Sequence, residues 1–552
     1  MKTKLIALLV SLALPLASAF AGEATAAAAD RPIVVGVSVP SLGTSLFESI
    51  ADGAEQAAAK LGVKVVVADA HWDLSTQVGD IEGFVAAGVQ GIVISPIPFG
   101  SLVPAIEAAV KAGIPVATVS SRANTDKVLV HVGVEDAATG RAAAKFIIDR
   151  LGNKGSLIEL DGPPGFNPEK KAAFDKVMKK SNVKVLVSQG SGFSRDEVGI
   201  VMASLVQKYP GFDAVYAAND DIVLGAIDAM SPVHIDPASK VTVGQDALPE
   251  AFQYIKEGKL SATIDQFPRK QGGQALEYLI AYVKNKTKPS KQVVLIAPEL
   301  VTKVPSSVKG EVRFPVRDSL ELSARLYRPE GGGSFPAVVL MHGCSGLWWG
   351  SGGVHRTARY LRDSGYVVLI VDSLTARNVS TVCDDPTNKS PTSSERVDDA
   401  LAARRYLSSL AFVDSRRIGL VGWSHGGITA LITWISRNSV ESDTAPFAAI
   451  AAYYPYCFDA DVRSASGPFL ILIGERDDWC PATLCQSLVA RATALGRDAS
   501  VTVYPGATHA FDCVEGGKSV EFLGHRMAPD LAAERNSHEL LLGFLDKALK
   551  KQ

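Results

Sequence analysis

Residues 417–434, RIGLVGWSHGGITALITW, contain the pattern G-x-S-x-G at Gly422–Gly426. The apolar run Ile418–Val421 precedes this pattern, and an apolar helical pattern follows it. This order predicts a strand, a sharp turn and a helix, in which the two glycines allow the strained backbone that raises a side chain above the sheet. We therefore predict that Ser424 is a nucleophile at the carboxyl end of a buried strand.

An acid and a histidine follow Ser424 in the chain order that this kind of turn requires. Asp477 follows one apolar strand-like run, and His509 follows the next one. We predict that His509 takes the serine proton, and that Asp477 orients the imidazole and stabilises its charged form. Asp478 is the alternative acid, but the G-x-x-D spacing from Gly474 favours Asp477.

A serine nucleophile also needs two backbone N–H groups aimed at the negative charge that develops on the substrate. His425 follows the nucleophile and is predicted to supply one of them. Cys344, in the turn after the apolar run Ala337–Met341, is predicted to supply the other. We expect a structural role for His342, and neither a metal ion nor an organic cofactor in this chemistry.

Residues 311–552 are predicted to form an α/β unit, with hairpin strands first and a mostly parallel sheet after them. Their motifs resemble the α/β-hydrolase superfamily, and specifically its dienelactone-hydrolase-like branch; the motifs are His342–Gly346, Gly422–Gly427, Asp477 and His509. True dienelactone hydrolases have Cys at the elbow, whereas Ser424 stands here, so the resemblance implies a serine carboxylic-ester hydrolase. Three tryptophans beside the catalytic loops are expected either to line an acyl or aromatic pocket or to pack in the core: Trp348, Trp349 and Trp479.

Residues 31–303 alternate short β-branched runs with helical patterns, which is typical of parallel βαβ units. Ser45–Glu48 has the S-x-x-E spacing of a helix-capping box. Several segments resemble the ribose-type periplasmic sugar-binding proteins of ABC importers; they are residues 69–96, 113–116, 218–220, 244–246, 264–266 and 299–303. The resemblance implies a type I fold, in which two Rossmann-like lobes are joined by hinges near residues 135, 266 and 295 and close on a ligand.

The positions that match the ligand-binding residues of that family are Phe47, Arg122, Asn219, Asp246 and Gln266. Polar side chains of these types can bracket the hydroxyls of a sugar, while an aromatic ring stacks on its C–H face. Three alternatives stay open: a surface ion pair for Arg122, an Asx cap for Asn219 and a turn for Asp246.

Three departures from the family pattern bear on the ligand. Leu46 replaces a frequent aromatic residue, Ser121 stands where an acid commonly precedes the arginine, and the loop at 169–171 is about two residues shorter. Without that acid the hydroxyls of a sugar lose a hydrogen-bond acceptor. A hydrophobic or anionic ligand is therefore an alternative to a sugar. Trp72 is expected to be a stacking wall or a loop anchor.

The first residues predict export. Lys2 and Lys4 precede the apolar run Leu5–Leu16, and an A-x-A cleavage site follows. Residues 1–21 are therefore predicted to be a cleaved signal peptide, and the protein to be periplasmic. The apolar run is shorter than the roughly 20 residues that cross a bilayer, so we expect no stable membrane insertion after cleavage.

The cysteines divide the chain, because residues 1–343 contain none and the remainder contains six. An even count in an exported protein favours disulfides, with 15 connectivities possible, and Cys344 with Cys383 is one expected pair. Oxidation would also remove the alternative of a Cys344 thiol nucleophile. No C-x-x-C pair is present, which disfavours a metal site.

The whole chain has 56 Lys+Arg, 58 Asp+Glu and 47% apolar residues, without a basic block, which excludes a typical nucleic-acid binder. The short segment 304–310 predicts two modules lying close together. We interpret the chain as a receptor for a small molecule, a sugar or an acylated or phenolic ester, fused to a serine esterase, with an ABC permease as a further candidate partner. The alternative is a transport or signalling receptor with a non-catalytic appendage.

Overall fold

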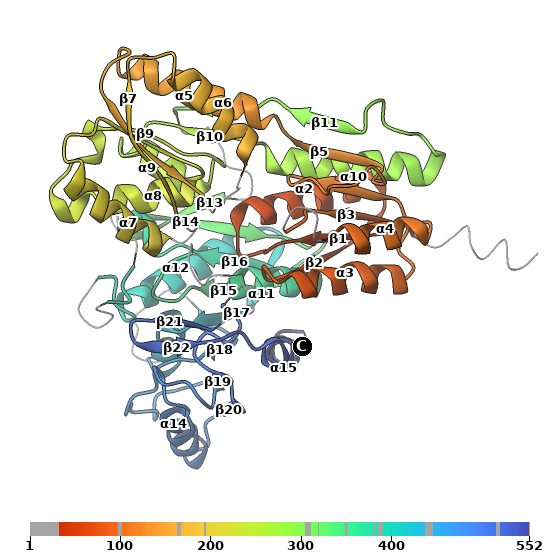
Figure 1. Cartoon of the computed structure of the whole chain (residues 1–552). Coiled ribbons are helices and arrows are strands. Elements are labelled where there is room, and N and C mark those ends of the chain that lie inside the picture. The colour runs from red at the N-terminus through yellow and green to blue at the C-terminus, as the bar shows by residue number, and fades with distance from the viewer. Residues whose placement is uncertain are drawn as a thin grey trace, which may run out of the picture.

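The structure is a computed structural model that describes residues 32–550 except 98–101, 163–166, 192–194, 304–310, 318–319, 330, 348–351, 378, 380, 385–389, 437–444 and 515–518. The predicted signal peptide and the segment 304–310 lie outside the described residues. Three main β-sheets form, two in the first module and one in the second (Figure 1). Within the described ranges, every helix is too short or too polar to span a bilayer.

Lobe 1 is a six-stranded parallel sheet in the order β11-β5-β4-β3-β1-β2. Its central strands are buried on both faces, which explains their continuous Val and Ile runs. The strands are β1 Val34–Val39, β2 Lys64–Asp69, β3 Gly91–Ile94, β4 Val116–Val119, β5 Val130–Val134 and β11 Val293–Ile296. The helices are α2 Ser45–Leu61, α3 Leu74–Ala86, α4 Val103–Lys111 and α10 Pro268–Asn285.

Helices α2 and α10 pack very closely, and glycines make this approach possible. A Cβ atom placed on Gly53 would lie 1.8 Å from the Arg269 carbonyl oxygen, and one on Gly272 would lie 2.0 Å from the Ile50 carbonyl oxygen. Only glycine fits at these two positions. This contact fixes α2, whose opposite face is available to the second module.

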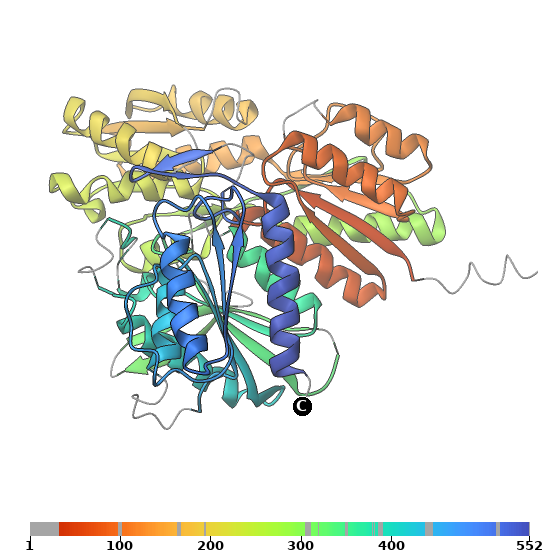
Figure 2. The same ribbon diagram turned by 90° about the horizontal axis from the view of Figure 1, so that it is seen from below.

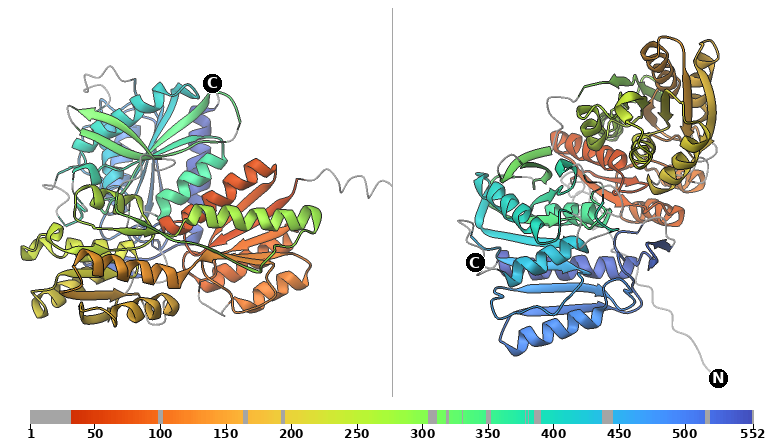
Figure 3. Two further views of the ribbon diagram at one scale, coloured as in Figure 1. Left: turned by 90° about the horizontal axis from the view of Figure 1, so that it is seen from above. Right: turned by 90° about the vertical axis from the view of Figure 1, so that its left-hand side faces the viewer.

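Lobe 2 is a four-stranded parallel sheet in the order β7-β6-β8-β9, beside lobe 1 (Figure 3, left). The chain passes between the lobes three times: between β5 and α5, between β10 and α10, and between β11 and β12. The strands of this sheet are β6 Ser156–Asp161, β7 Lys184–Gly190, β8 Ala214–Ala217 and β9 Val241–Val243. A separate antiparallel pair is formed by β10 Thr263–Asp265 and β12 Glu299–Val301. The helices are α5 Asp136–Arg150, α6 Pro168–Met178, α7 Arg195–Lys208, α8 Asp220–Asp228 and α9 Pro249–Lys256.

The second module is an eight-stranded sheet in the order β13-β14-β16-β15-β17-β18-β19-β20, antiparallel only at β13 and β14. Right-handed crossovers place α11 and α15 on one face and α12 and α13 on the other; Figure 2 shows α15 along the sheet. The strands of this sheet are β13 Glu311–Arg317, β14 Leu320–Tyr327, β15 Phe335–Met341, β16 Val367–Val371, β17 Val413–Trp423, β18 Ala449–Tyr453, β19 Phe469–Gly474 and β20 Ala499–Tyr504. A separate antiparallel pair is formed by β21 Val520–Phe522 and β22 His525–Met527. The helices are α11 Gly352–Asp363, α12 Glu395–Ser409, α13 His425–Ile435, α14 Ala482–Ala494 and α15 Leu531–Leu549.

The fold class predicted from the sequence, two Rossmann-like lobes followed by a hydrolase-type α/β sheet, is confirmed. In lobe 1 the order β2-β1-β3-β4-β5 is that of a doubly wound sheet. The two hairpin-like strands that enter the second module, β13 and β14, precede its parallel strands as the sequence indicated.

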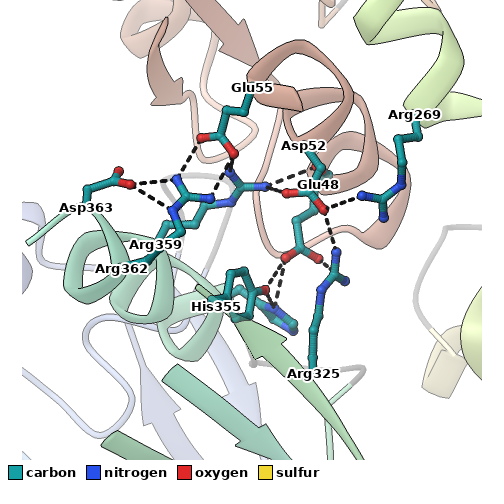
Figure 4. Close-up of polar contacts among 10 residues, drawn as sticks. Glu48, Asp52, Glu55, Arg269, Arg325, His355, Arg359, Arg362 and Asp363 are labelled. Carbon is teal, nitrogen blue, oxygen red and sulfur yellow. Dashed lines mark hydrogen bonds and ion pairs between the residues drawn. The ribbon is translucent and has the colours of Figure 1, made fainter. Parts of the chain in front are cut away.

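A row of charges joins α2 to the second module (Figure 4). Glu48, Asp52 and Glu55 lie at helical spacing on one face of α2. Arg325 of β14 lies 2.5 Å from the Glu48 carboxylate, and Arg359 of α11 lies 2.5 Å from that of Asp52. The third acid of the row, Glu55, is also paired with an arginine of α11: its carboxylate lies 2.7 Å from Arg362.

Glu48 is the most buried acid of this row and is only 1% exposed. Burial alone would raise the pKa of Glu48, but Arg325, His355 and Arg359 beside it hold that pKa well below its usual range. The Tyr327 hydroxyl also donates to the Glu48 carboxylate. Glu48 is therefore an ionised, fully paired carboxylate between the modules.

Replacing Glu48 by Gln is expected to lower the free energy of unfolding by about 3 kcal/mol, because Arg325 loses one of its two carboxylate partners and the buried Tyr327 hydroxyl loses its charged acceptor. Urea denaturation followed by tryptophan fluorescence measures the change. Asp363→Asn is the control, since the Asp363 side chain is 65% exposed and its loss should cost under about 0.5 kcal/mol. Equal effects of the two substitutions would contradict the importance of the buried row.

Candidate active site and binding cleft

The turn between β17 and α13 holds Ser424 in a strained conformation, with φ 50° and ψ −113°. A non-glycine residue at positive φ costs free energy and marks a functional turn. Glycines are required on both sides, because a Cβ on Gly422 would lie 2.0 Å from the Gly426 carbonyl oxygen and one on Gly426 would lie 2.3 Å from that of Met341. The sharp turn that the sequence pattern predicted is present.

Three side chains from separate loops form a continuous hydrogen-bonded relay. His509 Nε2 lies 3.0 Å from Ser424 Oγ, and His509 Nδ1 lies 2.8 Å from Asp477 Oδ2. The Asp477 carboxylate also accepts the Cys480 amide at 2.6 Å. Because a carboxylate only accepts, Nδ1 carries the proton and Nε2 is free to accept that of Ser424.

The alternative acid, Asp478, is not part of this relay. Its side chain is 52% exposed and its carboxylate lies 3.4 Å from His525. The structure therefore brings Ser424, His509 and Asp477 together and leaves Asp478 at the surface.

The turn after β15 lies beside the nucleophile. A Cβ atom on Gly343 would lie 3.7 Å from the Ser424 Cβ, so Cys344 follows a residue in contact with Ser424. His425 is the first residue of α13, where backbone N–H groups lack partners within the helix. Both predicted amide donors, Cys344 and His425, thus belong to turns that meet at Ser424.

Arg396 of α12, which the sequence reasoning missed, connects these two turns. Its Nη2 donates to the His342 carbonyl at 2.8 Å and its Nη1 to His425 Nδ1 at 2.9 Å. Arg396 is fully buried, and burial lowers its pKa to about 10. Burial and the charge of Arg396 also hold the pKa of His342 well below its usual range, so His342 is neutral.

The cysteines bear on the chemistry of the site. Cys344 forms a disulfide with Cys383, as expected, and Cys457 forms one with Cys485. Cys344 therefore offers its amide and not a thiol. Asp477, Cys480 and His509 form a group of potential metal ligands in the described part of the chain, but burial raises the pKa of Cys480 well above its usual value and keeps the thiol protonated.

Aromatic rings surround His509. The Tyr454 ring lies 4.7 Å from the imidazole, and the Trp479 ring lies 5.2 Å from it. Trp479 also stacks on His525 of β22 at 4.5 Å. Trp479 is therefore a wall beside the relay and not a residue of the deep core, whereas Trp348 and Trp349 lie outside the described residues.

The receptor residues fall into separate groups. Asp246 and Gln266 are hydrogen-bonded to each other and nearly buried. Burial raises the pKa of Asp246 to about 7, against the opposing charge of Lys170. The Phe47 ring meets the Trp72 ring edge-on at 5.4 Å on lobe 1.

The remaining two of the five predicted ligand-binding residues are Asn219 and Arg122. The Asn219 side chain accepts the Ile222 amide at 3.0 Å, so it caps α8 as the alternative interpretation held. Arg122 is exposed and its charge acts on His131. Lys170 was not among the binding residues predicted from the sequence. It is buried and donates to Gln245 Oε1 at 3.1 Å, and burial lowers its pKa.

The lobes and the relay define the class of the molecule: a two-lobed binding protein followed by a hydrolase with a nucleophile elbow. Residues 35–287 match the family described as periplasmic binding protein domain, and residues 322–548 match the dienelactone hydrolase family. The chain belongs to the periplasmic binding protein family through its first module. A domain that matches the dienelactone hydrolase family is fused to it.

Similar proteins cover the first module. The ribose import binding protein RbsB of Bacillus subtilis is 34% identical over 249 residues, which are 45% of this chain and 80% of that protein. The D-allose-binding periplasmic protein of Escherichia coli is 26% identical, over 46% of this chain and 84% of its own length. A solved solute-binding protein of Actinobacillus succinogenes with bound D-allose has 27% identity and a TM-score of 0.47, covering 50% of this chain and 98% of its own.

Because Asp477 bonds His509 and Asp478 does not, substitutions of the two acids are expected to affect kcat very differently. Asp477→Asn is expected to lower kcat for p-nitrophenyl acetate at least about 10³-fold, because the amide no longer fixes the His509 tautomer. Asp478→Asn, the matched control, should stay within about twofold because that carboxylate is mostly exposed. A larger loss from Asp478→Asn would show that the wrong acid is assigned.

Proposed function

We propose that the protein is an exported receptor–esterase in which the second module is a serine carboxylic-ester hydrolase. The observation that carries this proposal is the relay from Asp477 through His509 to Ser424, which lies at positive φ in the turn between β17 and α13. The matching family is a hydrolase family, and Ser424 is the residue at its elbow.

The reaction follows from these positions. Ser424 Oγ attacks the ester carbonyl carbon while its proton passes to His509 Nε2, and the amides of Cys344 and His425 hold the resulting oxyanion. The C–O bond to the alcohol then breaks, and the alcohol leaves with the proton from His509. Water, deprotonated by His509, attacks the acyl-enzyme and releases the acid.

Arg396 supports the oxyanion in this scheme. Its buried guanidinium holds the His342 carbonyl and the His425 side chain, which belong to the two turns that carry the proposed amide donors. Because the site is buried, a positive charge behind the two amides also favours negative charge on the substrate more than it would in water.

The first module is proposed to be a periplasmic receptor for a small sugar-like molecule. Asp246, Gln266 and Lys170 offer polar groups, while Phe47 and Trp72 offer aromatic rings. The relatives include a ribose import binding protein and a D-allose-binding periplasmic protein, which supports export to the periplasm and an ABC permease as a partner. An acylated sugar or a phenolic ester would suit both modules, since the receptor would raise its concentration near the esterase.

Ser424→Ala is expected to abolish turnover of p-nitrophenyl acetate, with a loss of at least about 10³-fold, because the nucleophile is removed. Ser487→Ala on α14 is the matched control, as that serine is exposed. If the Ser424→Ala rate equalled that of the wild type, the second module would be a non-catalytic appendage of a transport or signalling receptor.

Thermal-shift measurements with D-ribose, D-allose, xylitol and benzoate test the receptor. At least one of the sugars or xylitol is expected to raise the melting temperature, and Asp246→Asn to remove that shift. Since the pKa of Asp246 is raised to about 7, its accepting carboxylate form grows as the pH rises, so affinity should increase between pH 6 and pH 8. A shift with benzoate alone, or an affinity independent of pH, would contradict the sugar assignment.

A further inference from the structure

Arg356, in the first turn of α11, joins the receptor to the catalytic end of the hydrolase sheet. Its Nη1 lies 3.1 Å from the carboxylate of Asp69, the last residue of β2 in lobe 1. Its Nε lies 2.6 Å from the carboxylate of Glu534 on α15, and its Nη2 donates to the Asp512 carbonyl. Arg356, Asp69 and Glu534 are all less than 8% exposed. One guanidinium is therefore held from both modules, out of contact with water.

The hydrolase end of this link reaches the relay. Asp512 comes three residues after His509, and its carboxylate accepts the Trp423 indole at 2.8 Å and the Tyr454 hydroxyl at 2.6 Å. Trp423 directly precedes Ser424, and the Tyr454 ring packs against the His509 imidazole. The loop that Arg356 holds is thus the loop that places the base against the nucleophile.

The close packing of α11 on that loop leaves little room for adjustment. A Cβ atom on Gly353 would lie 2.7 Å from the Asp512 carbonyl oxygen. A shift of the Arg356 side chain must therefore be taken up by the loop from His509 to Asp512, since the helix beside it cannot approach further.

The receptor end of the link belongs to the rim of the proposed cleft. Asp69 accepts the His71 amide at 2.9 Å, and His71 and Trp72 both have positive φ in the tight turn that follows. The Trp72 amide donates to the Pro40 carbonyl at 2.7 Å, and its ring meets Phe47. Asp69 thus ties this turn to Arg356.

We propose that lobe 1 completes the esterase site: Asp69 orients Arg356, and Arg356 positions the loop that carries His509. The proposal rests on the esterase activity proposed above. Arg356 is a positioning residue in this scheme, because it touches neither the substrate nor the reacting atoms. The expected consequence is that a change in the receptor alters kcat on a substrate too small to reach the receptor.

Asp69→Asn tests the proposal in the full chain with p-nitrophenyl acetate. The substitution keeps the shape and removes the charge that strengthens the hydrogen bond to Arg356. The charge row on α2 stays intact, so the modules remain docked. Titration of Ser424 with a p-nitrophenyl phosphonate counts competent sites, so kcat per titrated site is independent of any unfolded fraction.

We expect kcat per titrated site to fall about fivefold, with KM unchanged, a coupling of ordinary size between sites. Asp52→Asn is the matched control, because Asp52 lies in the same contact but bonds Arg325 and Arg359, away from the His509 loop. Its kcat per site should stay within twofold of the wild type. Arg356→Met should reproduce the loss, and Arg356→Lys should recover part of it.

Three results would overturn the inference: an unchanged kcat per site in Asp69→Asn, an equal loss in Asp52→Asn, or a change confined to KM. Each leaves the esterase itself standing, provided that the wild type turns over the ester through Ser424. A wild type without turnover dependent on Ser424 would instead refute the proposed function.

Discussion

The paired charges between α2 and the second module determine how the two halves of the chain lie on each other. An ion that loses its water costs several kcal/mol unless it meets a partner of opposite sign. Glu48 is 1% exposed and Arg359 is 4% exposed, so each is stabilised only where the opposite charges of the other module surround it. The acids on α2 and the arginines on β14 and α11 therefore stabilise the observed contact between the modules.

This docking has a consequence for both sites. Lobe 1 carries the acidic face of α2, so the ion pairs join lobe 1 directly to the second module, whereas lobe 2 is connected to lobe 1 by three chain crossings. The same lobe brings Asp69 to Arg356, next to the loop that holds His509. The buried contacts of Arg356 therefore connect lobe 1 of the proposed receptor to the loop that carries the proposed base, His509.

Strain at the elbow is the second constraint. Ser424 keeps a positive φ only because its surroundings leave no alternative: Gly422 and Gly426 allow contacts that a side chain would forbid, and Arg396 and Asp512 hold the flanking turns from behind. Each of these supports is buried. The nucleophile is thereby placed before any substrate arrives, which is what a preorganised site requires.

The sequence by itself determined the elements, the elbow and the chain order of serine, acid and base, because a strand, a glycine turn and a helix are set by neighbours a few residues apart. Family resemblance added Asp246 and Gln266. Only the tertiary structure decided which charges are buried: Arg396 reaches His425 across 29 residues and Arg356 reaches Asp69 across 287. In a sequence such arginines look like any solvated surface charge, since burial depends on which surfaces meet, and no local pattern records that.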